Sequence, residues 1–279
     1  MTGFDRPRTG CPADLTIGLI DTGVDTAHPA LQGRRLKVQS FLRRGETAAP
    51  PDHATAVAAL LVGDPRQPDL AGLVPDAGIA VAAVFRSRDT ATDTTAGRLV
   101  EAIDWLLGRK ARVINLSLGG PPNRLLQRVV KMATQNGLVM LAAVGNQGPR
   151  QPPQYPAAYP GVVAVTAVDA RGRLFARANR GDAVDFAAPG VDIWVARPGG
   201  GAGFASGTSY AVPFVTALAA RWLAAAPALS PGQLYERLEA TARDLGPAGR
   251  DPAFGWGLVR AAPLPPAGNP DPAVSCAPH

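Results

Sequence analysis

Residues 203–213 have the sequence GFASGTSYAVP, and the Ala-rich apolar segment that follows carries no charge until Arg221. Gly203 and Gly207 favour a sharp turn, because neither has a Cβ, and Thr208 is a favourable N-cap. A helix without a polar face has to be buried on all sides. Ser209 would then lie at a helix N-terminus, where free backbone N–H groups can stabilise an oxyanion. Taken alone, this pattern is more often an N-capped core helix than a catalytic turn.

Length and composition favour one soluble α/β domain, because 279 residues with 46% hydrophobic and 18% charged residues can bury a large core. We expect an N-terminal extension over residues 1–14, the domain over residues 15–262, and a Pro- and Ala-rich tail over residues 263–279. The net charge of +6 comes from scattered arginines, so we expect no nucleic-acid partner. No run is suited to a membrane span, and we expect a monomer.

The two cysteines, Cys11 and Cys276, lie near opposite ends of the chain. They could form a disulfide if the protein is exported, or remain two free thiols, and the sequence does not decide between these alternatives. The first residues contain no apolar run long enough for a signal peptide.

Alternating strand and helix patterns predict a three-layer α/β fold, with a mainly parallel sheet and helices on both of its faces. Charge-free apolar runs predict buried strands at residues 15–20, 79–85, 113–116, 138–144 and 162–168. Helical spacing and capping residues predict helices at residues 52–61, 99–107, 125–133 and 231–243. In such sheets the functional groups lie at the carboxyl ends of the strands, and Asp21 follows the first strand.

The order of three residues decides which serine-nucleophile arrangement fits. The histidines are His28, His53 and His279. An α/β-hydrolase would need a histidine after its acid and a different serine motif, and a chymotrypsin-like order would place the histidine before the acid. The order that remains is Asp21, His53, Ser209, which is the order of subtilisin.

Five motifs resemble those of the subtilisin-like serine proteases, the subtilases, in the family's order. They are Asp21-Thr22-Gly23-Val24-Asp25 with His28-Pro29; His53-Ala54-Thr55-Ala56-Val57-Ala58; Asn115-Leu116-Ser117-Leu118-Gly119-Gly120; Ala142-Ala143-Val144-Gly145-Asn146; and Gly207-Thr208-Ser209-Tyr210-Ala211-Val212-Pro213. The resemblance implies a subtilisin-like fold and a serine endopeptidase that forms an acyl-enzyme. The sequence differs from the family's pattern at Ala54, where a glycine is usual, and at Ala56, where a second histidine is usual.

The resemblance also implies a role for each matched residue. Asp21, His53 and Ser209 would be the catalytic triad, and Asn146 would supply the side-chain donor of the oxyanion hole. Chemistry supports these roles, because a serine needs a neutral imidazole as base and the imidazole needs an orienting carboxylate. The expected substrate-binding residues are Ser117, Leu118, Gly119, Gly120, Ala143 and Gly145. His28 is expected to be structural, because its neighbours suggest a turn.

The expected substrates are peptides and unfolded proteins, docked by strand addition at the glycine-containing end of residues 116–120, with a broad preference before the scissile bond. Activity should rise as His53 loses its proton, at a pH above about 6.5. No cofactor is expected for the chemistry. A structural calcium ion is possible, with Asp89 and Asp93 the nearest candidate ligands, but no clear ligand spacing supports it.

Two other classes remain open. A catalytically silent relative would keep the fold and bind peptides without cleaving them. A serine-carboxyl peptidase is disfavoured, because His53 stands in its motif. The full-length protein is expected to be exported, as the family resemblance implies.

Overall fold

A computed structural model describes residues 15–89 and 91–261. Its strands are β1 (Thr16–Asp21), β2 (Leu36–Ser40), β3 (Gly78–Ala83), β4 (Arg86–Arg88), β5 (Ala91–Asp93), β6 (Ala111–Leu116), β7 (Val139–Ala143), β8 (Val162–Val168), β9 (Phe186–Pro189), β10 (Ile193–Arg197) and β11 (Gly201–Ala205). Its helices are α1 (Asp52–Val62), α2 (Ala96–Gly108), α3 (Arg124–Gln135), α4 (Thr208–Ala225) and α5 (Pro231–Thr241), with a short 3₁₀ helix, η1 (Pro68–Leu70). Both cysteines, residues 1–14 and the tail lie outside the described residues.

A seven-stranded sheet in the order β2-β3-β1-β6-β7-β8-β9 forms the centre of the molecule. All of its neighbouring strands are parallel. These strands are short and almost free of charge, and β3, β7 and β8 are buried along their whole length. This is the pattern expected when helices cover both faces of a parallel sheet, and the predicted α/β fold class is confirmed.

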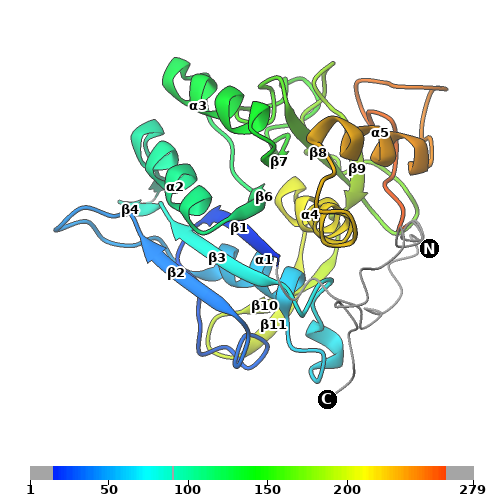
Figure 1. The fold of residues 1–279 in the computed structure, drawn as a ribbon. Helices are drawn as coiled ribbons and strands as arrows, with labels where there is room; N and C mark the ends of the chain where they lie inside the picture. Colours follow the sequence, from blue (N-terminus) through cyan, green and yellow to red (C-terminus); the bar gives the residue numbers. More distant parts are fainter. Residues whose placement is uncertain (1–14, 90, 262–279) are drawn as a thin grey trace.

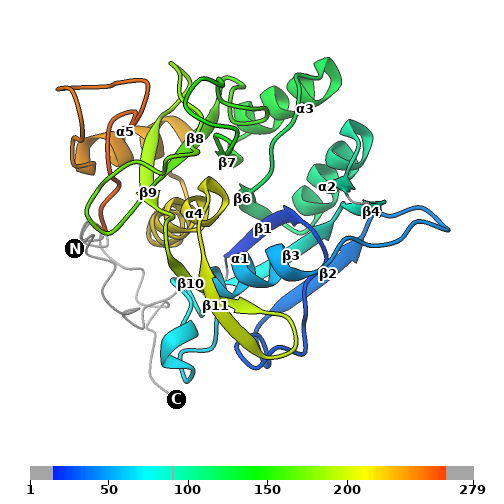
Figure 2. The same ribbon diagram turned by 180° about the vertical axis from the view of Figure 1, so that it is seen from behind.

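The helices form two layers, one on each face of the sheet (Figures 1 and 2). On one face α1, α4 and α5 bury side chains such as Ile17 and Val113. On the other face α2 and α3 bury the alternate residues, such as Ile20 and Ile114. Successive side chains of a strand point to opposite faces, so the same strands supply both cores.

The N-caps predicted from the sequence are found in the structure for two helices, α3 and α5, but not for α4. Asn123 Oδ1 caps α3 by accepting from two backbone N–H groups, and Ser230 caps α5 in a capping box with Gln233. Thr208 is not the N-cap of α4, because the cap is Gly207 and Thr208 is already helical. Its hydroxyl has a different partner, Asn146.

Two short hairpins and two strands of the sheet, β2 and β9, were not predicted from the sequence. Gly203 lies in β11 instead of a turn, paired with Val195 of β10. The β10–β11 hairpin extends past α1 and is joined to α4 through residues 206 and 207 (Figure 2). None of the described helices is long and apolar enough to cross a membrane.

Candidate active site

The direction in which the chain adds strands to the sheet reverses between β1 and β6. The chain adds β3 and β2 on one side of β1, and β6 to β9 on the other. Such a reversal leaves an opening at the carboxyl ends of the two strands, where ligands bind in open α/β sheets. Asp21 is the last residue of β1 and Ser117 follows the last residue of β6, so both lie at this opening.

Asp21 and His53 are in direct contact. Both carboxylate oxygens of Asp21 lie 2.8 Å from His53 Nδ1. Asp21 is only 2% exposed, and its Oδ1 also accepts from the backbone N–H of Thr22 at 2.7 Å. His53 is the second residue of α1. The contact requires Nδ1 to carry the proton, which leaves Nε2 of a neutral ring as an acceptor.

The surroundings of His53 act on its pKa in opposite directions. Burial lowers the pKa, while the negative charge of Asp21 and the hydrogen bond to it raise the pKa. Burial is the largest single effect, but the two raising effects together outweigh it, so the pKa of His53 lies above its ordinary value. The imidazolium form is therefore stabilised in this site.

Ser209 lies in the first turn of α4 and is half-buried. Its hydroxyl donates to the carbonyl oxygen of Ser117 at 3.2 Å, and no hydrogen bond joins it to His53 in the described chain. The ring of the next residue, Tyr210, lies 5.7 Å from the ring of His53, centroid to centroid. The structure therefore brings Ser209, His53 and Ser117 to one place.

Buried polar side chains hold the end of β6 against the start of α4. Ser117 Oγ donates to the backbone carbonyl of Ser209 at 2.9 Å. Asn115 Nδ2 donates to Ser117 Oγ at 2.8 Å, and Thr216 Oγ1 donates to Asn115 Oδ1 at 3.1 Å. Asn115 and Thr216 are fully buried. The side chain of Ser117 therefore positions Ser209, and the carbonyl oxygen of Ser117 is occupied by the Ser209 hydroxyl.

Asn146 is held beside the same turn. Its Oδ1 accepts from the backbone N–H and from the hydroxyl of Thr208, both at 3.0 Å. Because Oδ1 faces two donors, the orientation of the amide is fixed and Nδ2 is left without a hydrogen bond within residues 15–89 and 91–261. The backbone N–H of Ser209 likewise has no partner there. Two unpaired donors therefore lie close to Ser209.

The expected substrate-binding residues divide into two groups. The backbone groups of Leu118 and Gly119 have no hydrogen-bond partner among the described residues, whereas Gly120 is already paired with Tyr155 through bonds of 2.8 and 3.1 Å. Gly145 has a φ of +107° and its backbone is bonded to Thr208 and Asn179. Ala143 is buried in β7. Only Leu118 and Gly119 offer a free backbone edge.

Comparison with known protein families agrees with the motifs. The model of the subtilase family matches residues 13–257. The chain belongs to the subtilase family. The family resemblance of the five motifs is thus confirmed.

Relatives of this subtilase are found among curated proteins and solved structures. Subtilisin E of Bacillus subtilis is 34% identical over 241 residues, which cover 84% of this chain and 62% of that protein. Subtilisin of Bacillus pumilus is 33% identical, covering 84% and 86% of the two chains. The chain thus spans less than two thirds of the length of subtilisin E.

Two solved protease domains have a similar fold. A structure of the protease domain of PatA has a TM-score of 0.77 and 29% identity, covering 89% of this chain and 92% of that one. The prenylagaramide maturation protease PagA has a TM-score of 0.75 and 27% identity, covering 90% and 91%.

Tyr210 and Gln154 are two residues near the site of this subtilase that the sequence did not single out. Tyr210 is a motif residue, but only the structure places its ring against His53. Gln154 precedes Tyr155, and its side chain lies against Gly119. No local pattern marks Gln154, because its position depends on the pairing of Tyr155 with Gly120.

His28 is 1% exposed and accepts from the backbone N–H of Ala30 at Nδ1. Its Nε2–H therefore donates to the carbonyl of Gly201 at 2.9 Å, which ties the Asp21 loop to the β10–β11 hairpin.

The calcium candidate Asp93 is paired with arginine. Its carboxylate accepts from Arg86 Nε at 2.6 Å, and this hydrogen bond lowers the pKa of Asp93. No group of three or more histidine, cysteine, aspartate or glutamate side chains in the described part of the chain could hold a metal ion.

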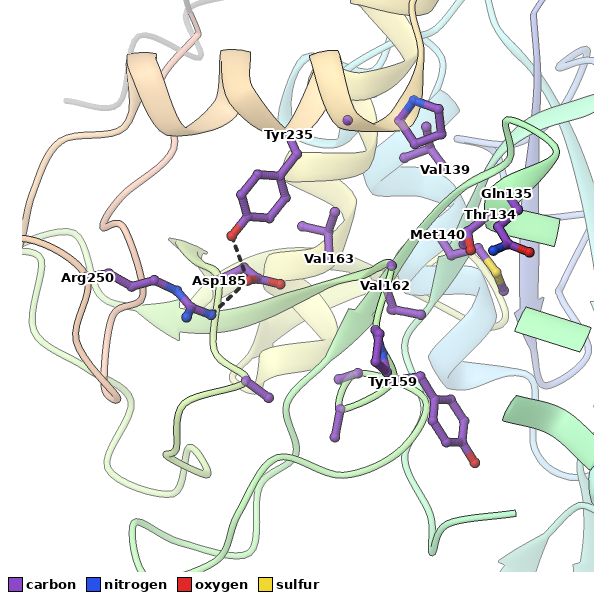
Figure 3. A pocket seen from close by; sticks show the side chains of 17 residues that line it. Thr134, Gln135, Val139, Met140, Tyr159, Val162, Val163, Asp185, Tyr235 and Arg250 are labelled. Carbon is purple, nitrogen blue, oxygen red and sulfur yellow. Dashed lines mark hydrogen bonds and ion pairs between the residues drawn. The ribbon is translucent and has the colours of Figure 1, made fainter. Parts of the chain in front are cut away.

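A separate cavity of about 580 Å³ is lined by residues at the amino ends of β7 and β8, among them Val139 and Val162 (Figure 3). Asp21 lies at the carboxyl end of its strand, β1. The buried acid of the cavity, Asp185, accepts from Tyr235 Oη at 2.8 Å and from Arg250 at 3.1 Å. Burial raises the pKa of Asp185 in spite of these bonds. The polar groups are paired with one another, so they join α5 and the C-terminal loop to the sheet.

Proposed function

We propose that this chain is a serine endopeptidase in which Asp21, His53 and Ser209 form the catalytic triad. The observation that carries the proposal is the contact between the buried carboxylate of Asp21 and His53 Nδ1, at 2.8 Å to both oxygens. This contact fixes the tautomer in which Nε2 can accept a proton. The names of the curated relatives, which are subtilisins, support the same activity.

In the proposed reaction, the Ser209 hydroxyl leaves the carbonyl of Ser117 and donates to His53 Nε2. Its oxygen attacks the substrate carbonyl carbon while its proton moves to Nε2, and the raised pKa of His53 favours the resulting imidazolium. Nε2 then gives this proton to the leaving nitrogen as the C–N bond breaks. A water molecule, deprotonated by the same nitrogen, hydrolyses the acyl-enzyme. The reaction needs no cofactor.

The negative oxygen of the tetrahedral intermediate needs hydrogen-bond donors. We assign Asn146 Nδ2 and the backbone N–H of Ser209 to this role. Both are near the nucleophile and neither has a partner among the described residues. Because Thr208 orients Asn146 before a substrate arrives, little reorganisation is needed during the reaction.

The substrates we propose are peptides and unfolded proteins. The free backbone groups of Leu118 and Gly119, with the Ser117 carbonyl once Ser209 has turned away, can pair with an extended chain. Such pairing requires a substrate backbone without competing structure. A stable globular protein should therefore be cut far more slowly than its reduced and alkylated form, and equal rates would contradict strand addition.

The full-length protein is proposed to be exported, in agreement with the name of one relative, the minor extracellular protease Epr of Bacillus subtilis.

A fluorophosphonate probe tests the triad directly. The wild-type protein should be labelled near neutral pH, and Ser209→Ala should not be labelled. A matched control is Ser206→Ala, whose hydroxyl bonds Asp192 outside the proposed triad. Equal labelling of Ser209→Ala and wild type would refute the assignment. An unlabelled wild-type protein that still binds peptides would instead be a silent relative.

A further inference from the structure

A pocket of about 500 Å³ lies at the amino ends of three neighbouring strands, β1, β2 and β3. It is lined by the first residue of each strand, namely Thr16, Leu36 and Gly78. Asp21 is the last residue of β1, so about 17 Å of strand separates this pocket from the proposed triad. The pocket is therefore distinct from the candidate active site.

Four of the residues that line this pocket are cationic and none is acidic. The four are Arg34, Arg35, Lys37 and Arg109. None of them forms an ion pair with another residue in the described part of the chain. Like charges that gather around a concave surface attract anions, because their fields add there. The charge of this pocket therefore favours an anionic ligand.

The carboxylates beside these cations leave the positive charge largely unbalanced. The pKa of Asp64 is lowered chiefly by its hydrogen bonds with Arg66, and least by the charge of Arg34. Both carboxylate oxygens of Asp64 are bonded to Arg66. Asp76 accepts from Arg35 Nη2 at 2.6 Å, but through its backbone carbonyl and not through its carboxylate. Neither acid thus neutralises the pocket.

Most of the hydrogen-bond donors of these cations are left for a ligand. The bond to Asp76 uses one of the five N–H groups of the Arg35 guanidinium. The guanidinium carbon of Arg109 lies 5.3 Å from the centre of the Trp105 ring, and this cation–π contact uses none of its N–H groups. Arg109 is also the C-cap residue of α2, which fixes its backbone at the pocket.

We propose that this pocket binds a small anion with two or more linked phosphate groups. A single phosphate group carries about −1.5 to −2 charges at pH 7, which balances only about half of the four positive charges. Arginine forks match phosphate oxygens in pairs, and Lys37 adds a compact point charge. The volume suits a small molecule and not a polymer. This inference does not depend on the proposed peptidase activity.

Isothermal titration calorimetry of the full chain with pyrophosphate and tripolyphosphate tests the proposal. Each should bind at one site, at least about tenfold more tightly than inorganic phosphate. Raising potassium chloride from about 50 to about 200 mM should weaken the binding severalfold, because salt screens exposed charges. Adenosine triphosphate separates the two sources of such a ligand. Equal affinity for it and for tripolyphosphate would identify an inorganic phosphate chain, and affinity more than about tenfold higher would identify a nucleotide.

Lys37→Gln and Arg109→Gln each remove one positive charge from an exposed side chain and should each weaken tripolyphosphate binding about tenfold. Arg128→Gln is the matched control, because Arg128 is an exposed arginine of α3 outside the pocket. It makes the same change in net charge and should alter the dissociation constant less than about twofold. An unchanged melting temperature without ligand would show that each variant is folded. Absence of binding to the wild type at low salt, or an equal loss in Arg128→Gln, would overturn the proposal.

Discussion

Replacing Asp21 by asparagine tests the geometry of the proposed base most directly. The two side chains have the same shape, and Asp21 is 2% exposed, so the change is chemical and hardly steric. Oδ1 accepts from the N–H of Thr22 at 2.7 Å. An asparagine would keep its oxygen at that position, and its NH₂ group would then face His53 Nδ1 where Oδ2 lay at 2.8 Å.

An NH₂ group facing Nδ1 requires Nδ1 to be an acceptor. The ring proton then moves to Nε2, which can no longer take a proton from Ser209. The corresponding change in a chymotrypsin-like protease lowers kcat about 10⁴-fold, and we expect a loss of similar size, about 5 kcal/mol of barrier at 1.36 kcal/mol per tenfold. The pKa of His53 should also fall, because the charge and hydrogen bond that raise the pKa are lost while burial, which lowers it, remains.

The assay is kcat/KM for a quenched peptide, measured from pH 4 to pH 9 for wild type and Asp21→Asn. The wild-type rate should rise with a midpoint above about 6.5, and the midpoint for the variant should lie below that value. Asp25→Asn is the control, since the Asp25 carboxylate bonds Ala27 and Gly199 but not His53. A loss of less than tenfold in Asp21→Asn, or an unchanged midpoint, would refute the reasoning.

Three further predictions concern other parts of the chain. Asn146→Ala should lower kcat by about 10² to 10³ with less than about a threefold change in KM, a magnitude known from subtilisin, a relative of this chain; a change in KM alone would contradict it. Tyr235→Phe removes the hydrogen bond to Asp185 and should lower the melting temperature by about 3 to 10 °C without affecting fluorophosphonate labelling. EDTA should leave the melting temperature unchanged, and a fall of several degrees would show that a structural ion is required.

The sequence was sufficient to predict the parts of the fold that depend on local pattern. The buried strand β8 is a short charge-free run, and β1 carries a charge only at its last residue, Asp21. Helix α5 begins after Ser230, which forms a capping box with Gln233, and has a proline at its first position. The candidate triad could also be identified from sequence, because each residue lies beside a glycine- or alanine-rich motif at the end of an element.

Elements that depend on distant partners could not be predicted. Strand β11 has the sequence GAGFA, with no strand propensity of its own, and forms because β10 pairs with it. The position of Gln154 is set by the pairing of Tyr155 with Gly120, 35 residues earlier in the chain. The links from Asp185 to Tyr235 and Arg250 span 50 and 65 residues.

The wrong N-cap prediction has a functional reason. As an N-cap, Thr208 would direct its hydroxyl oxygen to an N–H of the first turn, whereas here that oxygen accepts from the backbone N–H of Gly145. Instead, the helix begins at Thr208, and Asn146 Oδ1 accepts from both its N–H and its hydroxyl. The N–H of Tyr210 bonds the carbonyl of Gly207, so the N–H of Ser209 is left unpaired between two satisfied neighbours. Departures from local rules are expected where a site needs free groups, and here the departure leaves both proposed oxyanion donors unpaired and one of them oriented.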